Sequence, residues 1–397
     1  MAFGDFTVDR NSTKYVLGSG GDIISYATDE PAFEFNTDGS YKGLLVEPAA
    51  TNICLQSEDL STTWTPVDNG AVDTSSTETP DGDTSSKSIK IEDDGSTGTG
   101  FVLISQTITV AANTKYTASV FLKADQLAFA SLSADNYDGS TDGQQYFGLS
   151  GAGSLGTSLN LDDSSIEAYP NDWYRCSITW TQGAADTQFL FRIWVAGSIS
   201  SVVVDLDGSS SIFAWGAQVE TGPIATSYIP TTTASVTRVK DDITQTSASS
   251  LIGQTEGTLY LEVYWRETTG AYQFLLAASD GSANNRVVIY TLNTTSDLRM
   301  AASANGSPLT DQGVSSSGFS GIQKIALAYA DADFELYQNG SSISSDTTGS
   351  LASLATLTDI DLGQIYTATL QANMWIRAVA LFPRRLSDTE AQALTTL

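Results

Sequence analysis

Residues 188–196 read QFLFRIWVA. Along this stretch a set of purely apolar side chains alternates with a set that includes an arginine and a tryptophan. This is the period-2 pattern of a β-strand with one face in a core. The inward face would hold Phe189, Phe191, Ile193 and Val195, and the outward face Leu190, Arg192 and Trp194. The stretch therefore predicts a sandwich strand whose outer face presents a cation and an indole ring.

Similar segments recur on both sides of this strand, separated by turn signals such as Asp-Gly at 81–82 and 207–208. Ser387 and Glu390 have the spacing of a capping box and predict one short C-terminal helix. The expected strands are 101–110, 115–122, 173–181, 201–206 and 212–219 in the first half, and 257–265, 272–277, 286–291, 322–329, 334–338 and 374–382 in the second. We therefore expect an all-β chain of two tandem β-sandwiches.

Residues 221–252 contain two prolines and many Ser and Thr, which predicts a connector with a domain boundary near residue 235. The predicted division is an N-terminal segment at 1–48, a first sandwich at 49–235 and a second sandwich at 236–397. The chain has 397 residues, which is enough for a sizeable core in each sandwich.

The formal net charge of −28 predicts that nucleic acid and anionic membranes repel the chain. No apolar run is long enough to span a bilayer, and the N-terminus MAFGDFTVDR lacks a signal-peptide pattern. We therefore expect synthesis in a host cytoplasm and no membrane insertion. The absence of histidine excludes a Ser-His-Asp triad and HExxH zinc chemistry.

In GLLVEPAATN, residues 43–52, an acid ends an apolar run and is followed by proline. Glu47 is then either a catalytic carboxylate or part of an elbow where a new domain begins. Pro48 fixes its own φ and biases Glu47 toward an extended conformation. No partner acid or base is identifiable, so we interpret Glu47 and Pro48 as an elbow, with Glu47 meeting backbone amides or a basic side chain.

A ligand site is most readily predicted from the aromatic residues. Arg192 and Trp194 on one outer strand face could form a platform for a sugar ring, because an aromatic ring packs on a pyranose face and Arg donates hydrogen bonds. The other candidates are Phe121, Lys123, Tyr137 and Tyr146. The alternative is that these side chains belong to a second packed layer or a subunit interface. We place Trp173, Trp180 and Trp215 in the first core, and Trp265 and Trp375 in the second.

Acidic residues give weaker signals. Asp205 and Asp207 could help to bind a structural calcium ion, the only cofactor that we consider, but their pattern favours a plain strand end. Asp359 and Asp361 alternate as a catalytic pair would, yet they lack a third acid. Asp331, Asp333 and Glu335 fall at a turn between two strands, which favours a surface role. No catalytic residue is predicted.

Several sequence blocks resemble bacteriophage and prophage virion proteins of the head spike, head fibre or tail fibre kind. The blocks are GLLVEPAATN with QSEDLSTTW, NDWYRCSITW (171–180), IFAWGAQVETGPIATSYIPTT (212–232) and SVTR (235–238). The later blocks EGTLYLEVYW (256–265), KIALAYADADFELYQNG (324–340) and MWIRAVALFPRRLSDTEAQAL (374–394) resemble the concanavalin A-like lectin domain that often follows. The family usually has Arg at the positions of Ala32 and Ala50, which implies that the contact of the N-terminal segment with the first sandwich is made differently here.

The resemblance implies a carbohydrate-binding-module-like jelly roll followed by a concanavalin A-like sandwich, in a virion protein whose N-terminal segment docks on the particle. Its implied partners are other virion proteins and host cell-surface polysaccharide. The family further implies a homo-oligomer, a trimer, in which weak sugar contacts multiply. We expect a non-enzymatic adhesion protein. The alternatives are a structural adaptor or decoration protein, and a capsule polysaccharide depolymerase acting through two carboxylates.

Overall fold

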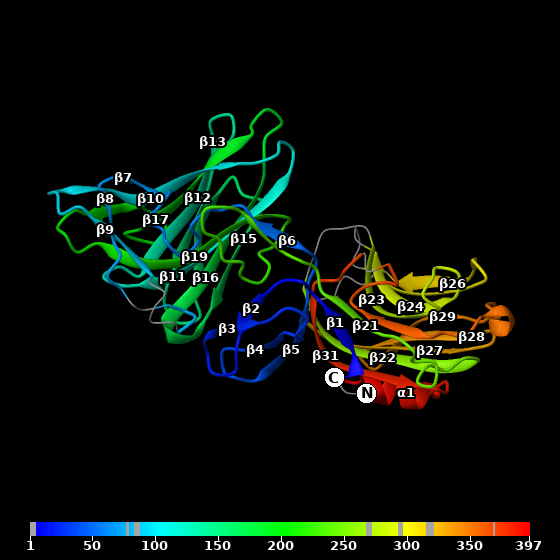
Figure 1. Cartoon of the computed structure of the whole chain (residues 1–397). Coiled ribbons are helices and arrows are strands. Elements are labelled where there is room, and N and C mark those ends of the chain that lie inside the picture. The colour runs from blue at the N-terminus through cyan, green and yellow to red at the C-terminus, as the bar shows by residue number, and fades with distance from the viewer. Residues whose placement is uncertain are drawn as a thin grey trace.

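The computed structural model describes residues 5–76, 79–82, 88–266, 272–292, 297–314, 321–367 and 370–397. Strands make up nearly all of the regular structure and form two lobes, each a pair of packed sheets (Figure 1). The predictions of an all-β fold, of two sandwiches and of one short C-terminal helix are confirmed. Among the described residues, no helix is long and apolar enough to cross a membrane.

The first sandwich is built from two antiparallel sheets. One has the order β14 (Ser154–Leu159), β13 (Thr141–Gly148), β12 (Phe129–Asp138), β17 (Gln188–Val195), β10 (Thr99–Thr109) and β18 (Val203–Asp205), and β7 (Thr65–Asp68) also pairs with β10. The other has the order β15 (Asp163–Ala168), β16 (Trp173–Thr181), β11 (Lys115–Ala124), β19 (Ser211–Thr221), β9 (Ile89–Asp93) and β8 (Gly70–Asp73). A short 3-10 turn, Pro170–Asp172, precedes β16.

The core of this sandwich follows from the alternation along its strands. Phe189, Phe191 and Ile193 of β17 are buried against Leu132 of β12 and Trp180 of β16. A fully buried Leu, Ile or Phe stabilises the fold by about 1.5–3 kcal/mol relative to an exposed one. The two free cysteines, Cys54 and Cys176, lie in the same core as buried thiols. Every second residue of β17 is therefore left to face outward.

The second sandwich is built from two seven-stranded sheets. One has the order β1 (Thr7–Asp9), β21 (Asp242–Gln245), β30 (Asp359–Leu362), β23 (Tyr272–Ser279), β24 (Arg286–Leu292), β25 (Asp297–Ala304) and β26 (Ser307–Val314). The other has the order β29 (Ser341–Asp346), β28 (Asp333–Gln338), β27 (Gly321–Ala330), β22 (Glu256–Trp265), β31 (Met374–Phe382), β5 (Tyr41–Val46) and β4 (Phe33–Phe35). A 3-10 turn at Leu351–Ser353 precedes β30.

The N-terminal segment supplies strands to this second sandwich. β1 pairs with β21, and β5 pairs with β31 through Val46 opposite Met374. The first sandwich is thus inserted between β5 and β21, and the chain enters and leaves it through two paired strands, β6 (Ala50–Asn52) and β20 (Val236–Arg238). β1, β4 and β5 thus belong to the sheets of the second sandwich, and the predicted division at residues 48 and 235 stays a prediction. A docking role for residues 1–48 stays a prediction.

Two further elements cover outer faces of the sheets. The hairpin of β2 (Lys14–Leu17) and β3 (Ile23–Tyr26) lies between the lobes, against the β11 and β16 side of the first sandwich (Figure 1). The helix α1 (Asp388–Thr395) begins with the predicted capping box, in which Ser387 accepts from the Glu390 amide. Its Ala391 packs on Tyr260 and Tyr337 of the second sandwich.

Candidate functional site

The predicted outer face of β17 lies on the surface of the first sandwich, in the middle of its sheet. Cross-strand pairing places Arg192 in one row with Ser133 of β12 and Ser105 of β10. Trp194 lies in the next row, opposite Ser131, which in turn lies opposite Tyr146 of β13. The structure therefore brings Arg192, Trp194 and Tyr146 onto one face.

An open groove of about 870 Å³ runs over β10 and β17 on this face. Its floor includes Leu190, Arg192, Ser105, Thr107 and Thr109. Its walls are formed by the segments at 53–55 and 63–67 and by the connector at 233–235. The lining is therefore rich in hydroxyl groups, each of which can donate one hydrogen bond and accept others.

Hydrogen bonds fix Arg192, which lines the groove, and Trp194, which lies in the next row of the same sheet face. Arg192 Nη1 donates to the carboxylate of Asp135, and the guanidinium carbon lies 5.7 Å from the centre of the Trp194 ring. Trp194 Nε1 donates to Ser133 Oγ over 2.9 Å. Burial raises the pKa of Asp135, while hydrogen bonds from Ser133 and the charge of Arg192 oppose that rise. The buried Nε of Arg192 has no hydrogen-bond partner among the described residues.

This arrangement suits recognition of a polyhydroxylated ligand. Such a ligand can exchange hydrogen bonds with the threonines and Ser105, and its apolar ring faces can pack beside Trp194 and the exposed ring of Phe101, which lies edge-on to it at 6.2 Å. None of the groove-lining side chains is an acid, so the groove itself holds no pair of carboxylates for glycoside hydrolysis.

The other sugar-binding candidates lie apart from this groove. Tyr137 is half-buried and donates to the carbonyl of Asn160, whereas Tyr146 lies on the outer face in the row of Trp194, two strands away from it. Phe121 is only 1% exposed, packed against Trp215 and Tyr228 beneath the β2–β3 hairpin. The ring of Phe121 cannot reach a ligand, so its prediction is wrong, and Lys123 lies on that same covered sheet face.

The tryptophan predictions had mixed outcomes. Trp180 lies in the first core and Trp265 in the second, as expected. Trp173 and Trp215 are buried on the opposite sheet face, in the cluster with Phe121. Trp375 is buried against Val16, Ala32 and Leu45 of the N-terminal segment, not inside the second sandwich. The aromatic layer considered as the alternative to a sugar platform is therefore real on this side of the molecule.

Glu47 lies at the elbow and is fully buried among charges. Its carboxylate forms ion pairs with Lys14 at 3.1 Å and Arg238 at 3.6 Å, and it accepts a hydrogen bond from the Ser227 amide at 2.8 Å. Asp241 joins Lys14 at 2.6 Å and Arg10 at 3.0 Å. Burial alone raises the pKa of Glu47, but Arg238, Lys14 and Ser227 lower it well below its usual value.

Pro48 completes this elbow, because its carbonyl accepts from Arg238 Nη2 over 2.9 Å. The charged network ties the N-terminal segment to the strands that lead into and out of the first sandwich. A carboxylate held between two cations without access to solvent is suited to fixing an elbow, not to catalysis. The contacts agree with the elbow interpretation of Glu47 and Pro48.

The acidic candidates form no metal site among the described residues, where no group of three or more Cys, Asp or Glu side chains is placed to hold an ion. Asp207 accepts from the amide and hydroxyl of Ser209, and these bonds lower its pKa. Asp205 is an exposed strand end. Two carboxylates alone supply fewer oxygen ligands than calcium takes, and a structural calcium ion at this place stays an untested prediction.

The remaining acids are engaged in structural contacts or buried. Arg385 pairs with Asp333 at 2.8 Å and Glu335 at 3.2 Å, and Asp331 accepts from the Leu351 amide, in agreement with a surface turn. Asp361 is 3% exposed, and its Oδ2 has no hydrogen-bond partner in the part of the chain that the structure describes. Burial and the nearby charges of Asp242 and Asp359 raise its pKa to about 7. A carboxyl that a substrate cannot reach is a poor general acid.

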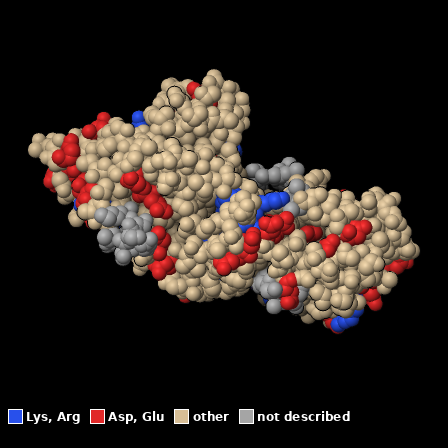
Figure 2. All heavy atoms as spheres, viewed as in Figure 1, with Lys and Arg blue, Asp and Glu red and all other residues tan. Residues whose placement is uncertain are grey.

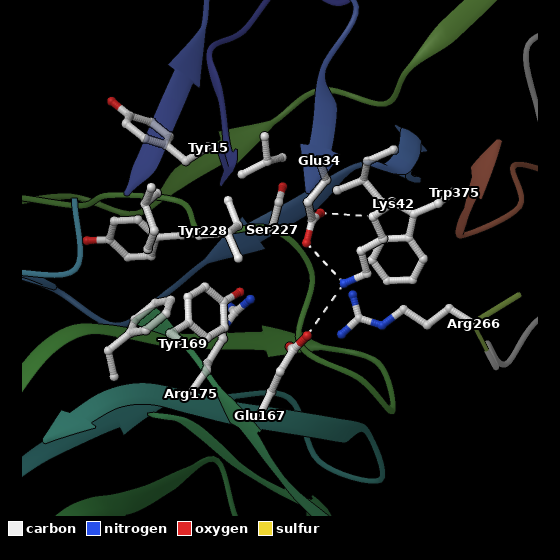
Figure 3. A pocket seen from close by; sticks show the side chains of 15 residues that line it. Tyr15, Glu34, Lys42, Glu167, Tyr169, Arg175, Ser227, Tyr228, Arg266 and Trp375 are labelled. Carbon is white, nitrogen blue, oxygen red and sulfur yellow. Dashed lines mark hydrogen bonds and ion pairs between the residues drawn. The ribbon is translucent and has the colours of Figure 1, made fainter. Parts of the chain in front are cut away.

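A charged junction between the lobes was not predicted from the sequence. Lys42 of β5 bridges Glu34 at 3.1 Å and Glu167 of the first sandwich at 3.4 Å, and lies 4.0 Å from the centre of the Trp375 ring (Figure 3). Arg266 lies 5.5 Å from the same ring. Lys and Arg gather at this place in the space-filling view, while acids are spread over both lobes (Figure 2). The cavity here measures about 20 Å³, which is room for about one water molecule and for no larger ligand. The charged junction therefore serves to hold the two lobes together.

Comparison with known proteins gives weak similarities only. No protein-family model and no curated protein matches the chain. Among solved structures, the CBM40 module of the Ruminococcus gnavus IT-sialidase is similar at 17% identity and a TM-score of 0.31, over 37% of this chain and 86% of the module. Trypanosoma rangeli sialidase has 12% identity and a TM-score of 0.32, over 77% and 60%. The SAP-like pentraxin from Limulus polyphemus has 12% identity and a TM-score of 0.29, over 35% and 68%.

Proposed function

We propose that this chain is a non-enzymatic bacteriophage virion protein, a head spike, head fibre or tail fibre, that mediates adhesion to host-surface glycans. The observation that carries the adhesion part is the open, hydroxyl-lined groove on the first sandwich, with Arg192 in its lining and Trp194 in the next row of the same sheet face. The virion part rests on the sequence blocks that resemble phage spike and fibre proteins. The proposed location is the surface of the particle.

The shape of the groove favours a chain of sugars over a single small ligand. It is open along its length, so an extended polysaccharide can lie in it without threading an end. Its polar side chains are neutral, namely hydroxyls and the amide of Gln106, apart from Arg192, whose charge is compensated by Asp135. Each such contact is weak, and a homo-oligomer of the proposed kind would multiply several of them into stable attachment.

A steric variant tests the adhesion part. Thr107 is exposed in the floor of the groove, so Thr107→Trp fills the groove without opening the core. Thr157 is exposed on β14 of the same sheet and does not line the groove, which makes Thr157→Trp the matched control. Retention on immobilised host polysaccharide should be lost in the first variant and kept in the second. Equal retention of both variants would show that the groove is not the binding site.

An imaging reconstruction of the intact particle tests the virion part. The proposal expects both sandwiches to project into solvent with the groove uncovered. If other shell or tail proteins cover the groove, the chain is an architectural component and the adhesion proposal fails.

A further inference from the structure

The outer face of the second sandwich carries a second hollow, of about 400 Å³, over β23, β24 and β25. Its middle row is made of small side chains, since Ala277 lies opposite Val288 and Val288 opposite Ala301. Small residues at the centre of a sheet face leave room for a flat ligand. The segment after β30 supplies Ile365 and Tyr366 as a side wall.

One side of the hollow is aromatic. Phe274 and Tyr290 are stacked with ring centres 5.4 Å apart, and Tyr272 lies 5.8 Å from Tyr290. Tyr272 is 46% exposed, so its ring presents a free surface to the hollow. Rings arranged in this way offer the apolar surface on which the C–H face of a sugar ring can pack.

The other side of the hollow carries an arginine whose side chain has no partner among the described residues. Arg286 lies between Ser279 and Ser303 in the next row of the sheet, about 13 Å along β24 from Tyr290. Of the lysines and arginines in the described part of the chain, Arg286 alone has a side chain with no hydrogen bond, ion pair or ring contact to another described residue. Its buried Nε has no hydrogen-bond partner there. In a chain with a net charge of −28, an uncompensated arginine is conspicuous.

The acid in this hollow does not neutralise Arg286. Asp311 is held by Arg299 at 3.0 Å and accepts a hydrogen bond from the Tyr290 hydroxyl at 2.6 Å. Arg299 Nε also donates to that hydroxyl over 2.9 Å. This pair fixes the ring of Tyr290 and leaves the positive charge of Arg286 available to a ligand.

We infer that this hollow is a second saccharide site, selective for a pyranose ring that carries a carboxylate. The ring would lie over Ala301, against the exposed ring of Tyr272, with its carboxylate on the guanidinium of Arg286, a charge-assisted and potentially bidentate contact. The inference rests on the proposed glycan-binding function for its ligand class. This second site differs from the proposed groove because it lies on the second sandwich, is formed by other residues and requires a negative charge on the sugar.

The test is the affinity of the full chain for methyl β-D-glucuronide and methyl β-D-glucoside. The two sugars differ only at C6, which is a carboxylate in the glucuronide and a hydroxymethyl group in the glucoside. The affinities are measured by ligand-detected NMR titration in 150 mM salt. We expect the glucuronide to bind about tenfold more tightly, because a hydrogen bond to a charged group is worth about that factor. Arg286→Gln should remove the preference. Arg384→Gln, which neutralises an exposed arginine paired with Glu390, should keep it. Tyr272→Ala should weaken both sugars equally.

The two proposals can fail separately. If Arg286→Gln retains the preference, or if wild-type chain does not distinguish the two sugars, the second site is refuted. Retention on host polysaccharide, and its loss in Thr107→Trp, would still decide the proposed function. If Thr107→Trp removes the glucuronide preference while Arg286→Gln does not, the acidic sugar binds in the first sandwich, and the inference is overturned.

Discussion

Replacing Asp361 by Asn should stabilise the chain at alkaline pH and do so much less at acidic pH. Asp361 lies on β30 with Thr244 on one neighbouring strand and Ala277 on the other. Burial, and then Asp242 and Asp359, raise its pKa to about 7 from the ordinary 3.8. In the folded state the carboxyl therefore holds its proton over a pH range in which the unfolded chain has lost it.

The sign and size of the stability change follow from the linkage between proton binding and folding. A raised pKa means that the folded state binds more protons, so stability falls as pH rises from about 4 and is lowest above about 7. A difference of about 3 in pKa corresponds to about 4 kcal/mol when the group is ionised. Roughly 1 kcal/mol of this cost is already present at pH 4.5, so Asp361→Asn should gain at most about 3 kcal/mol more at pH 8.5 than at pH 4.5.

Denaturant unfolding or calorimetry at the two pH values measures this difference. About 3 kcal/mol corresponds to a shift of several degrees in the unfolding temperature. Asp207→Asn is the matched control, because Asp207 is exposed and its pKa is lowered by Ser209. An equal effect of Asp361→Asn at pH 4.5 and pH 8.5 would refute the reasoning, since a purely steric change does not depend on pH.

Two further predictions concern the elbow at Glu47 and the binding of calcium at Asp207. Glu47→Gln leaves Lys14 and Arg238 less compensated in a buried site, and should lower the free energy of unfolding by about 3–5 kcal/mol in urea titrations, whereas Glu335→Gln near the surface should change it by less than about 1 kcal/mol. An effect of Glu47→Gln as small as that of the control would contradict the structural role of the elbow. Chelation with EDTA should leave the unfolding temperature unchanged, because Asp207 is engaged by Ser209; a rise of several degrees on adding calcium would contradict this.

Local pattern was sufficient for the strands and the helix. The alternation in 188–196 correctly separated the buried Phe191 and Ile193 from the outward Arg192 and Trp194, because that division depends only on the pleat of one strand. The capping box at Ser387 likewise depends on residues three apart. Both signals lie within the segment that they describe.

Features that join distant segments could not be predicted in this way. Phe121 has the same alternation as Trp194, and only the β2–β3 hairpin, about 100 residues earlier in the sequence, makes one of them buried and leaves the other at the surface. Trp375 is buried by the N-terminal segment through the same kind of contact. The presence of Arg286, Tyr290 and Tyr366 around one hollow depends on strand order and on a loop after β30, neither of which alternation specifies.

A glycan microarray probed with the purified chain tests the central claim most directly. The account predicts that wild-type chain and Thr157→Trp bind a common set of polysaccharides and that Thr107→Trp loses them. If wild-type chain binds no glycan, or if Thr107→Trp binds as wild type does, the first-sandwich groove is not an adhesion site and the account is contradicted.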